Sequence, residues 1–286
     1  MKKFLPCFLC LVFLLFGSAF AEIHIDEEAP ESWKDKDILV LTAFQMYGND
    51  GALLEVGGKS ILIDGGVKGQ RFSLEKALAG MGYEGHVDII YNTHPHDDHI
   101  GAVNYMLRFG FTADEFISTF PEDYNDPEQI AAVKLLKQNG IPYHQVQNEE
   151  TLEIGGASFK FFCFPDGRDP NALSSTVLIT FGSSRLLMTA DASSGTVRYF
   201  HKKYTNGELR AEVMKYPHHG ITTVDNEFVE DVAPEFAYIT NYTSATPAVD
   251  LQLRQRNIKF KHTSYGRIVL KTDGTDWYIT QYRGVY

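Results

Sequence analysis

Short apolar runs bounded by Gly, Asn, Asp and Pro indicate β-strands along most of the sequence, and stretches with apolar residues three or four positions apart lie between them. The runs typical of strands cover 38–41, 52–56, 60–63, 87–91, 115–118, 144–146, 151–154, 157–164, 175–181, 185–188, 212–216, 236–240, 267–270 and 277–281. The stretches typical of helices cover 71–81, 98–107, 127–138, 195–204, 227–232 and 249–256. Turns rich in Gly and Asn join the first three strands, which predicts an antiparallel meander.

The order of these elements indicates one domain with two similar halves. Each half begins with adjacent strands and continues with alternating strands and helices, and no Pro- or Ser-rich linker separates the halves. Because a sheet must cover its apolar faces, we expect two facing mixed β-sheets with helices on their outer sides. The predicted fold class is therefore α/β, a four-layer αβ/βα sandwich formed by residues 37–286.

The N-terminus has the pattern of a secretory signal peptide. Two lysines precede the apolar run 4–16, and the ending Ala19-Phe20-Ala21 suits cleavage after Ala21. The alternative is an uncleaved membrane anchor, for which the apolar run is short. We expect residues 1–21 to be removed and residues 22–36 to form an irregular, acidic lead-in. The mature protein would then be exported, periplasmic or extracellular, without stable membrane insertion.

The charge of the chain excludes one class of partner. The full chain has 26 Lys and Arg against 37 Asp and Glu, and cleavage after Ala21 would remove two lysines, which gives the mature chain a formal charge of −13. Proteins that bind long nucleic acids normally present a basic surface, because release of counterions supplies much of the affinity. We therefore expect no tight, sequence-independent binding of nucleic acid.

The densest set of potential metal ligands is the segment Thr93-His94-Pro95-His96-Asp97-Asp98-His99, which directly follows the apolar run 87–91. Imidazole nitrogens and carboxylate oxygens are donors that divalent metal ions take in proteins. On an extended chain the side chains of His94 and His96 project to the same side, so both can reach one ion. Asp98 and His99, at the start of the expected helix, can turn back to a second ion. The alternative is a polar surface loop that happens to be rich in histidine.

Further candidate ligands follow other expected strands. Asp191 comes after an apolar strand and is placed to bridge two cations, or alternatively to cap the next helix. The adjacent His218 and His219 suggest one metal ligand and one group that orients a ligand or transfers a proton. Asp64 is a candidate to orient a ligand, or else a turn residue beside two glycines.

The segments Asp64-Gly65-Gly66, His-x-His-x-Asp-His, Thr189-Ala190-Asp191 and Pro217-His218-His219-Gly220 resemble, in order and spacing, the metallo-β-lactamase superfamily. The resemblance implies two divalent ions, zinc or manganese. It implies that His94 and His96 bind the first ion, that Asp98, His99 and His219 bind the second, and that Asp191 bridges them. His219 is preferred over His218 because the last ligand of the family commonly precedes a glycine.

Two segments narrow the resemblance to one branch. Lys215-Tyr216-Pro217-His218-His219-Gly220 and the loop Asn171-Ala172-Leu173-Ser174-Ser175 resemble the hydrolase domain of competence DNA-uptake proteins and, more loosely, cell-wall phosphorylcholine esterases. This makes Asn171 and Ser174 candidates to support a ligand or contact the substrate.

The sequence departs from the β-lactamases of the family at one point. They carry a third histidine for the first ion about twenty residues before the bridging Asp, and this chain has Asp166, Asp169 and Asn171 in that region. We expect a weaker first site with more oxygen donors, which favours manganese or loosely held zinc. Hydrolysis of antibiotics is correspondingly less favoured.

The leading hypothesis is an exported metal-dependent phosphodiesterase that uses a metal-activated water. In this hypothesis Asp98 or Asp191 orients the water, His218 protonates the leaving oxygen and Lys215 binds phosphate charge on a small or polymeric phosphodiester. For His218 and Lys215 the alternatives are a packed histidine and a solvated lysine. Two other functions remain open: hydrolysis of a carboxylic ester, lactone or β-lactam at the same centre, and a non-catalytic exported metal-binding module.

Overall fold

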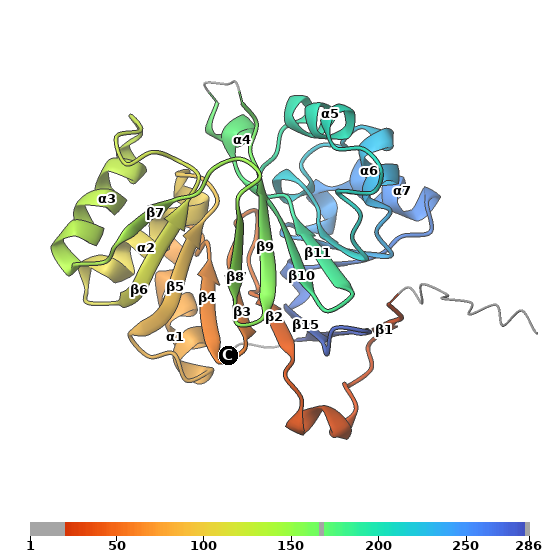
Figure 1. The fold of residues 1–286 in the computed structure, drawn as a ribbon, viewed down its shortest axis with the longest axis horizontal. Helices are drawn as coiled ribbons and strands as arrows, with labels where there is room; N and C mark the ends of the chain where they lie inside the picture. Colours follow the sequence, from red (N-terminus) through yellow and green to blue (C-terminus); the bar gives the residue numbers. More distant parts are fainter. Residues whose placement is uncertain (1–20, 166–168, 284–286) are drawn as a thin grey trace, which may run out of the picture.

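Two β-sheets face each other and helices cover both outer sides (Figure 1), which confirms the expected four-layer sandwich. The computed structural model describes residues 21–165 and 169–283, so the expected signal peptide lies outside the described residues except for Ala21. The helices are α1 (Arg71–Gly80), α2 (Asp97–Arg108), α3 (Pro127–Asn139), α4 (Pro170–Leu173), α5 (Ser194–Lys203), α6 (Asn226–Val232) and α7 (Pro247–Gln255). In this part of the chain no helix has the length and apolar character to cross a membrane.

The first sheet has nine strands among the described residues, in the order β1-β16-β15-β2-β3-β4-β5-β6-β7. Their bounds are β1 Ile23–Ile25, β16 Trp277–Tyr282, β15 Arg267–Thr272, β2 Leu39–Ala43, β3 Ala52–Val56, β4 Lys59–Ile63, β5 His86–Asn92, β6 Thr112–Ser118 and β7 Tyr143–Gln145. Strands β2, β3 and β4 form the expected antiparallel meander, and β4 to β7 are parallel.

The second sheet has seven strands within the described ranges, in the order β14-β13-β12-β11-β10-β9-β8. Their bounds are β14 Lys259–His262, β13 Phe236–Ile239, β12 Val213–Lys215, β11 Ser184–Met188, β10 Thr176–Phe181, β9 Ala157–Phe162 and β8 Thr151–Ile154. Strands β11 to β14 are parallel. Strand β14 was not predicted from the sequence, because this edge strand is only partly buried and carries two lysines among its four residues.

The segment 22–36 differs from the irregular lead-in expected from its composition. Residues Ile23–Ile25 form β1, which pairs in parallel with β16 at the edge of the first sheet, and Glu31–Asp35 form a short 3₁₀ helix that buries Trp33. An edge strand needs only one neighbour for its backbone hydrogen bonds, so an acidic segment with little apolar periodicity can still join a sheet. This segment is part of the domain.

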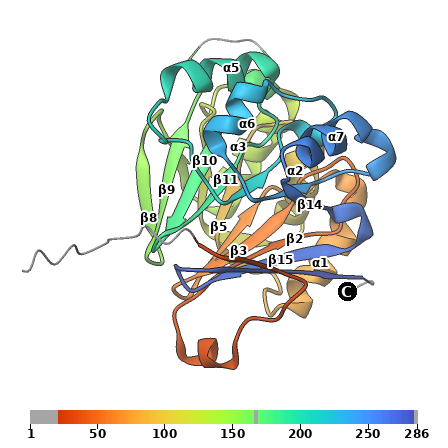
Figure 2. The same cartoon turned by 90° about the vertical axis from the view of Figure 1, so that its right-hand side faces the viewer.

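Three apolar clusters hold the layers together. The largest lies between the two sheets and includes Leu41 of β2 and Phe161 of β9. The second packs α1, α2 and α3 against the first sheet, and the third packs α5, α6 and α7 against the second sheet. Figure 2, turned by 90°, shows α5, α6 and α7 on the side of the second sheet that faces away from the first.

The hairpin between β8 and β9 passes close to the first sheet, and only glycine fits there. Gly155 has a φ of 57°, and a Cβ at this position would lie 2.1 Å from the carbonyl oxygen of Val56. We expect Gly155→Ala to lower the free energy of unfolding by about 2–3 kcal/mol, through both steric overlap and backbone strain. Gly156→Ala is the matched control, because Gly156 has a φ of 81° but nothing within 4 Å of its Cβ. Urea unfolding should give a smaller loss for the control, and equal losses would contradict the steric argument.

Candidate metal centre

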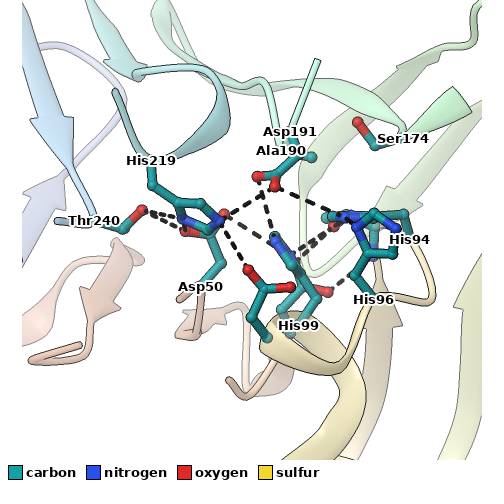
Figure 3. A network of polar contacts seen from close by, with 12 residues as sticks. Asp50, His94, His96, His99, Ser174, Ala190, Asp191, His219 and Thr240 are labelled. Atoms are coloured by element: carbon teal, nitrogen blue, oxygen red, sulfur yellow. Dashed lines mark hydrogen bonds and ion pairs between the residues drawn. The ribbon is translucent and has the colours of Figure 1, made fainter. Parts of the chain in front are cut away.

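Segments from both sheets bring polar side chains to one place between the sheets (Figure 3). Asp64 follows β4, residues 93–99 run from β5 into α2, Asp191 follows β11, His218 and His219 follow β12, Thr240 follows β13, and Asp50 lies in the connection between β2 and β3. The carboxyl ends of parallel strands lie at one edge of a sheet, which is why residues far apart in the sequence meet here. The structure thus brings together the motifs that the sequence analysis singled out.

Four buried acidic and histidine side chains form the centre of this cluster. Asp50, His99, Asp191 and His219 each have one potential ligand atom within 4.8 Å of those of the other three. Both imidazoles direct Nε2 towards the carboxylate of Asp191, at 3.3 Å for His99 and 3.2 Å for His219. Asp191 does not cap α5, because Ser193 is the residue that accepts a backbone N–H there.

The ring of His99 is oriented by Asp64. The distance from His99 Nδ1 to Asp64 Oδ2 is 2.8 Å, and the same carboxylate accepts hydrogen bonds from Asn92 Nδ2, from Thr93 N and from Thr93 Oγ1. A carboxylate on Nδ1 leaves Nε2 free to bind a metal and fixes the direction of the ring. Asp64 is thus almost fully buried and fixes the ring of His99, which is more than a turn residue beside two glycines would do.

The ring of His219 is oriented in the same way by Asp50 and Thr240. Nδ1 of His219 lies 3.1 Å from Asp50 Oδ1 and 2.9 Å from Thr240 Oγ1, and Thr240 donates to the same carboxylate oxygen. Sequence reasoning missed both residues. The connection that contains Asp50 has the composition of an ordinary Gly-, Asn- and Asp-rich turn. The only local hint that Asp50 is buried is the apolar strand 52–56 that follows it.

Three buried donor atoms of this cluster lack a hydrogen-bond partner, and their arrangement fits a divalent ion. Among the described side chains, His99 Nε2, His219 Nε2 and Asp191 Oδ1 are buried and have no hydrogen-bond partner. Two ligands that bind one tetrahedral ion at about 2.0–2.2 Å lie about 3.3 Å apart. The separations among His99, Asp191, His219 and Asp98 match this: Asp98 Oδ2 lies 3.3 Å from His219 Nε2. These residues would hold one ion.

The electrostatics of the cluster favour added positive charge. Burial alone would lower the pKa of His99, but the carboxylates of Asp191 and Asp64 raise it to about 10. The pKa of His219 also ends well above its usual value, because Asp50 and Asp191 outweigh the effect of burial. Burial raises the pKa of Asp191, yet His99 and His219 hold it well below its usual value. A divalent cation on the two Nε2 atoms would supply the positive charge that these carboxylates attract.

The side of the centre assigned to a first ion contains fewer donors. His94 Nε2 lies 3.2 Å from His96 Nδ1, and it lies 3.9 Å from Asp191 Oδ2. Burial lowers the pKa of His94 well below its usual value, so this imidazole is neutral and can bind a metal. Asp169 caps α4 through the backbone N–H of Asn171, and Asp166 lies outside the described residues.

His218 and Asn171 border the same side. His218 Nε2 lies 3.6 Å from Asp191 Oδ2, and Asn171 Nδ2 lies 3.4 Å from His218 Nε2. The side chain of His218 is 33% exposed and that of Asp98 is 28% exposed, whereas the side chains of Asp191 and His219 are almost fully buried. Solvent, and therefore a substrate, reaches the centre from the side of His218 and Asp98. Burial lowers the pKa of His218, so its ring is neutral at pH 7.

Lys215 and Ser174, the candidates to bind phosphate charge and to contact the substrate or support a ligand, are both buried. The side chain of Lys215 is 2% exposed and its ammonium group pairs with Asp50, so it is neither a solvated lysine nor placed to bind substrate phosphate. Ser174 is fully buried, and its Oγ donates to the carbonyl oxygen of Asn171 at 2.8 Å. The hydroxyl of Ser174 therefore stabilises the loop of Asn171 and is not presented to solvent. A short hydroxyl and a long ammonium can both turn inward, which sequence alone does not reveal.

Comparison with known families gives one match that covers most of the domain. Residues 50–233 match the model described as "Metallo-beta-lactamase superfamily". The matched range includes Asp50 at its start and all the histidines described above. A search of curated proteins finds no significant match.

Solved structures with a similar fold are distant in sequence. The metallo-beta-lactamase fold protein YhfI from Bacillus subtilis has 14% identity and a TM-score of 0.55, and the alignment covers 83% of this chain and 100% of that one. CmlA, a diiron beta-hydroxylase from Streptomyces venezuelae, has 17% identity and a TM-score of 0.52, and the alignment covers 86% of this chain and 55% of that one. At these identities the comparison establishes the fold alone.

Proposed function

Because the chain belongs to the metallo-β-lactamase superfamily and has a buried His/Asp metal site, we propose that this metal-dependent hydrolase is an exported phosphodiesterase. Within the superfamily we place it with the branch that includes the hydrolase domain of competence DNA-uptake proteins and the phosphorylcholine esterases. The segment Lys215 to Gly220 and the loop around Asn171 support this placement. The pattern of residues 1–21 supports export.

One observation carries the proposal of a hydrolytic metal centre. Two imidazole nitrogens, of His99 and His219, and one carboxylate oxygen, of Asp191, are buried without hydrogen-bond partners and point at one another. Buried polar atoms are normally hydrogen-bonded, so metal donors that face one another without hydrogen bonds call for a specific explanation. A divalent ion explains all three atoms at once.

Each residue of the centre has a distinct role in the proposed hydrolysis. Divalent ions bound at this centre supply Lewis-acid activation of water and of a phosphoryl oxygen. His99 and His219, each fixed through Nδ1 by a carboxylate, hold the centre in place, and Asp191 joins its two sides. Asp98 lies at the accessible side, where its carboxylate orients the attacking water. His218, partly exposed at the same side, can donate a hydrogen bond to the leaving oxygen, and it can protonate that oxygen only after its neutral ring has taken up a proton.

The accessible side favours a phosphoryl group over an acyl group. Instead of the third histidine of the β-lactamases, this chain presents the amide of Asn171 beside the imidazole of His218. Both are neutral hydrogen-bond donors and suit the two non-bridging oxygens of a phosphodiester, whereas the carbonyl group of a β-lactam presents a single oxygen. A formal charge of −13 on residues 22–286 argues for a small or flexible substrate in preference to long duplex DNA.

The test is an activity panel on residues 22–286 loaded with manganese or zinc. We expect cleavage of bis-p-nitrophenyl phosphate, and this activity should fall at least about a hundredfold in Asp98→Ala because a water-orienting group is lost. Asp97→Ala is the matched control: it removes the neighbouring carboxylate of the same helix, which is solvent-exposed, and should leave the rate within about twofold of wild type.

The same panel decides between the proposed function and the alternatives. It includes phosphorylcholine esters, single-stranded DNA, a chromogenic cephalosporin and an acyl lactone. Preferential cleavage of the cephalosporin or the lactone would replace the phosphodiesterase by an acyl hydrolase on the same centre. No cleavage of any substrate above the Asp98→Ala background, together with less than one bound ion per chain, would favour a non-catalytic module.

A further inference from the structure

A buried lysine lies inside the metal centre. Lys215, the last residue of β12, donates a hydrogen bond from Nζ to the carbonyl oxygen of Ala190 at 2.7 Å and pairs with Asp50 Oδ2. Its Nζ also lies 3.7 Å from Asp191 Oδ1. Lysine is rarely this buried unless its charge is paired, so the contact with Asp50 is what allows a positive charge at this depth.

The lysine and a metal ion compete for the same carboxylate. Asp50 is one of the four residues whose ligand atoms cluster within 4.8 Å, yet both of its oxygens are already used. Oδ1 accepts from Thr240 and faces His219, and Oδ2 faces the ammonium group of Lys215. As long as this pair is intact, neither oxygen of Asp50 is free to bind the metal, and Asp50 contacts the ligand set through His219.

The charge of Lys215 also acts on the ion itself. An ion bound to Asp191 would lie only a few Å from the ammonium group, and like charges this close repel strongly in a site that excludes water. We propose that Lys215 lowers the affinity of the centre for divalent cations by holding Asp50 out of the ligand set and by repelling the ion. In this proposal the centre binds its metal ion less tightly, and releases it more readily, than the same centre would without the charge of Lys215. The inference rests on the metal-binding part of the proposed function.

The test measures metal affinity, with no need for a substrate. The dissociation constants of zinc and manganese are measured on residues 22–286 by competition with a chromogenic chelator. Lys215→Met removes the charge and keeps a flexible side chain of similar length, and we expect it to tighten binding at least tenfold. A merely structural lysine predicts the opposite sign, because disorder of Asp50 and Ala190 would weaken binding.

A double variant separates the charge of Lys215 from its packing. In Lys215→Met/Asp50→Asn the local net charge equals that of the wild-type ion pair, and the amide oxygen of Asn can still accept from Thr240 and His219, so affinity should return to within about threefold of wild type. Lys59→Met is the control variant outside the metal centre. Lys59 pairs with Asp88 at a distant, partly exposed site, so its loss should leave metal binding unchanged.

The outcomes separate this inference from the proposed function. If the wild-type protein binds no divalent ion, the metal centre itself is refuted. If the wild type binds an ion and folded Lys215→Met binds it equally or less tightly, only the role of Lys215 is refuted. Should Lys215→Met fail to fold, Lys215→Gln gives the same comparison. Asp50→Asn then serves as a further check: it leaves the lysine charge unopposed and should weaken binding at least tenfold, and unchanged affinity would overturn the inference.

Discussion

Asp191→Ala is expected to reduce bound metal to well below one ion per chain and to abolish hydrolysis. Its carboxylate lies within 4 Å of nitrogen atoms on His94, His99, His218 and His219, so it is the group that both sides of the centre share. We expect the rate on bis-p-nitrophenyl phosphate to fall by at least about a thousandfold, more than the 10–100-fold typical of residues that only orient a ligand. Elemental analysis after reconstitution and initial rates measure the two effects.

An Asp–His pair outside the centre provides the control for this variant. Asp231 of α6 pairs with Nδ1 of His201, partly exposed to solvent. Asp231→Ala should keep the metal content and the rate of the wild type. A wild-type metal content in Asp191→Ala would show that the ions bind elsewhere, whereas loss of activity with metal retained would restrict Asp191 to a catalytic role.

The second large effect is expected for Asp64→Ala, on stability as well as on metal affinity. The Asp64 carboxylate faces four polar atoms, on Asn92, Thr93 and His99, and it is almost fully buried. Alanine would leave these groups without their partner, and it tolerates the φ of 53° less well than aspartate does. We expect the free energy of unfolding of the metal-free protein to fall by about 3 kcal/mol or more. Metal affinity should fall 10–100-fold, because His99 loses its orientation.

Urea unfolding in excess chelator and metal competition measure these two effects separately. Asp88→Ala is a suitable control, because Asp88 also accepts several hydrogen bonds, from Ser60 and Lys59, but lies at the start of β5, far along the strand from the centre. It should lower stability by about 1 kcal/mol and leave metal affinity unchanged. If Asp64→Ala retained wild-type metal affinity, the orientation of His99 through Nδ1 would be unimportant.

The backbone at the centre is strained, and we therefore expect its residues to tolerate little change. Ala190, His218 and His219 all have positive φ values, of 44°, 48° and 50°. Such conformations cost of the order of 1–3 kcal/mol each for residues other than glycine, and they are common at functional sites. Here they turn two adjacent histidines and the neighbour of Asp191 into the space between the sheets.

The local pattern of the chain determined the fold and the histidine-rich part of the site. Short apolar runs predicted most strands, because most strands are largely buried and their own residues supply the apolar surface. The spacing of His94, His96 and His99 identified potential ligands, because donors so close in sequence must also be close in space. The family match over residues 50–233 agrees with that local information.

The tertiary structure alone decided the remaining features. Strand β1 depends on an edge offered by β16, about 250 residues away. Asp50 looks like a turn residue until the fold places it beside His219 and Thr240, which are 169 and 190 residues farther along the chain. Lys215 looks like a solvated lysine until the second sheet buries it against that carboxylate. The physical reason is the same in each case: pairing and burial depend on contacts between distant segments, and the sequence around one residue does not contain them.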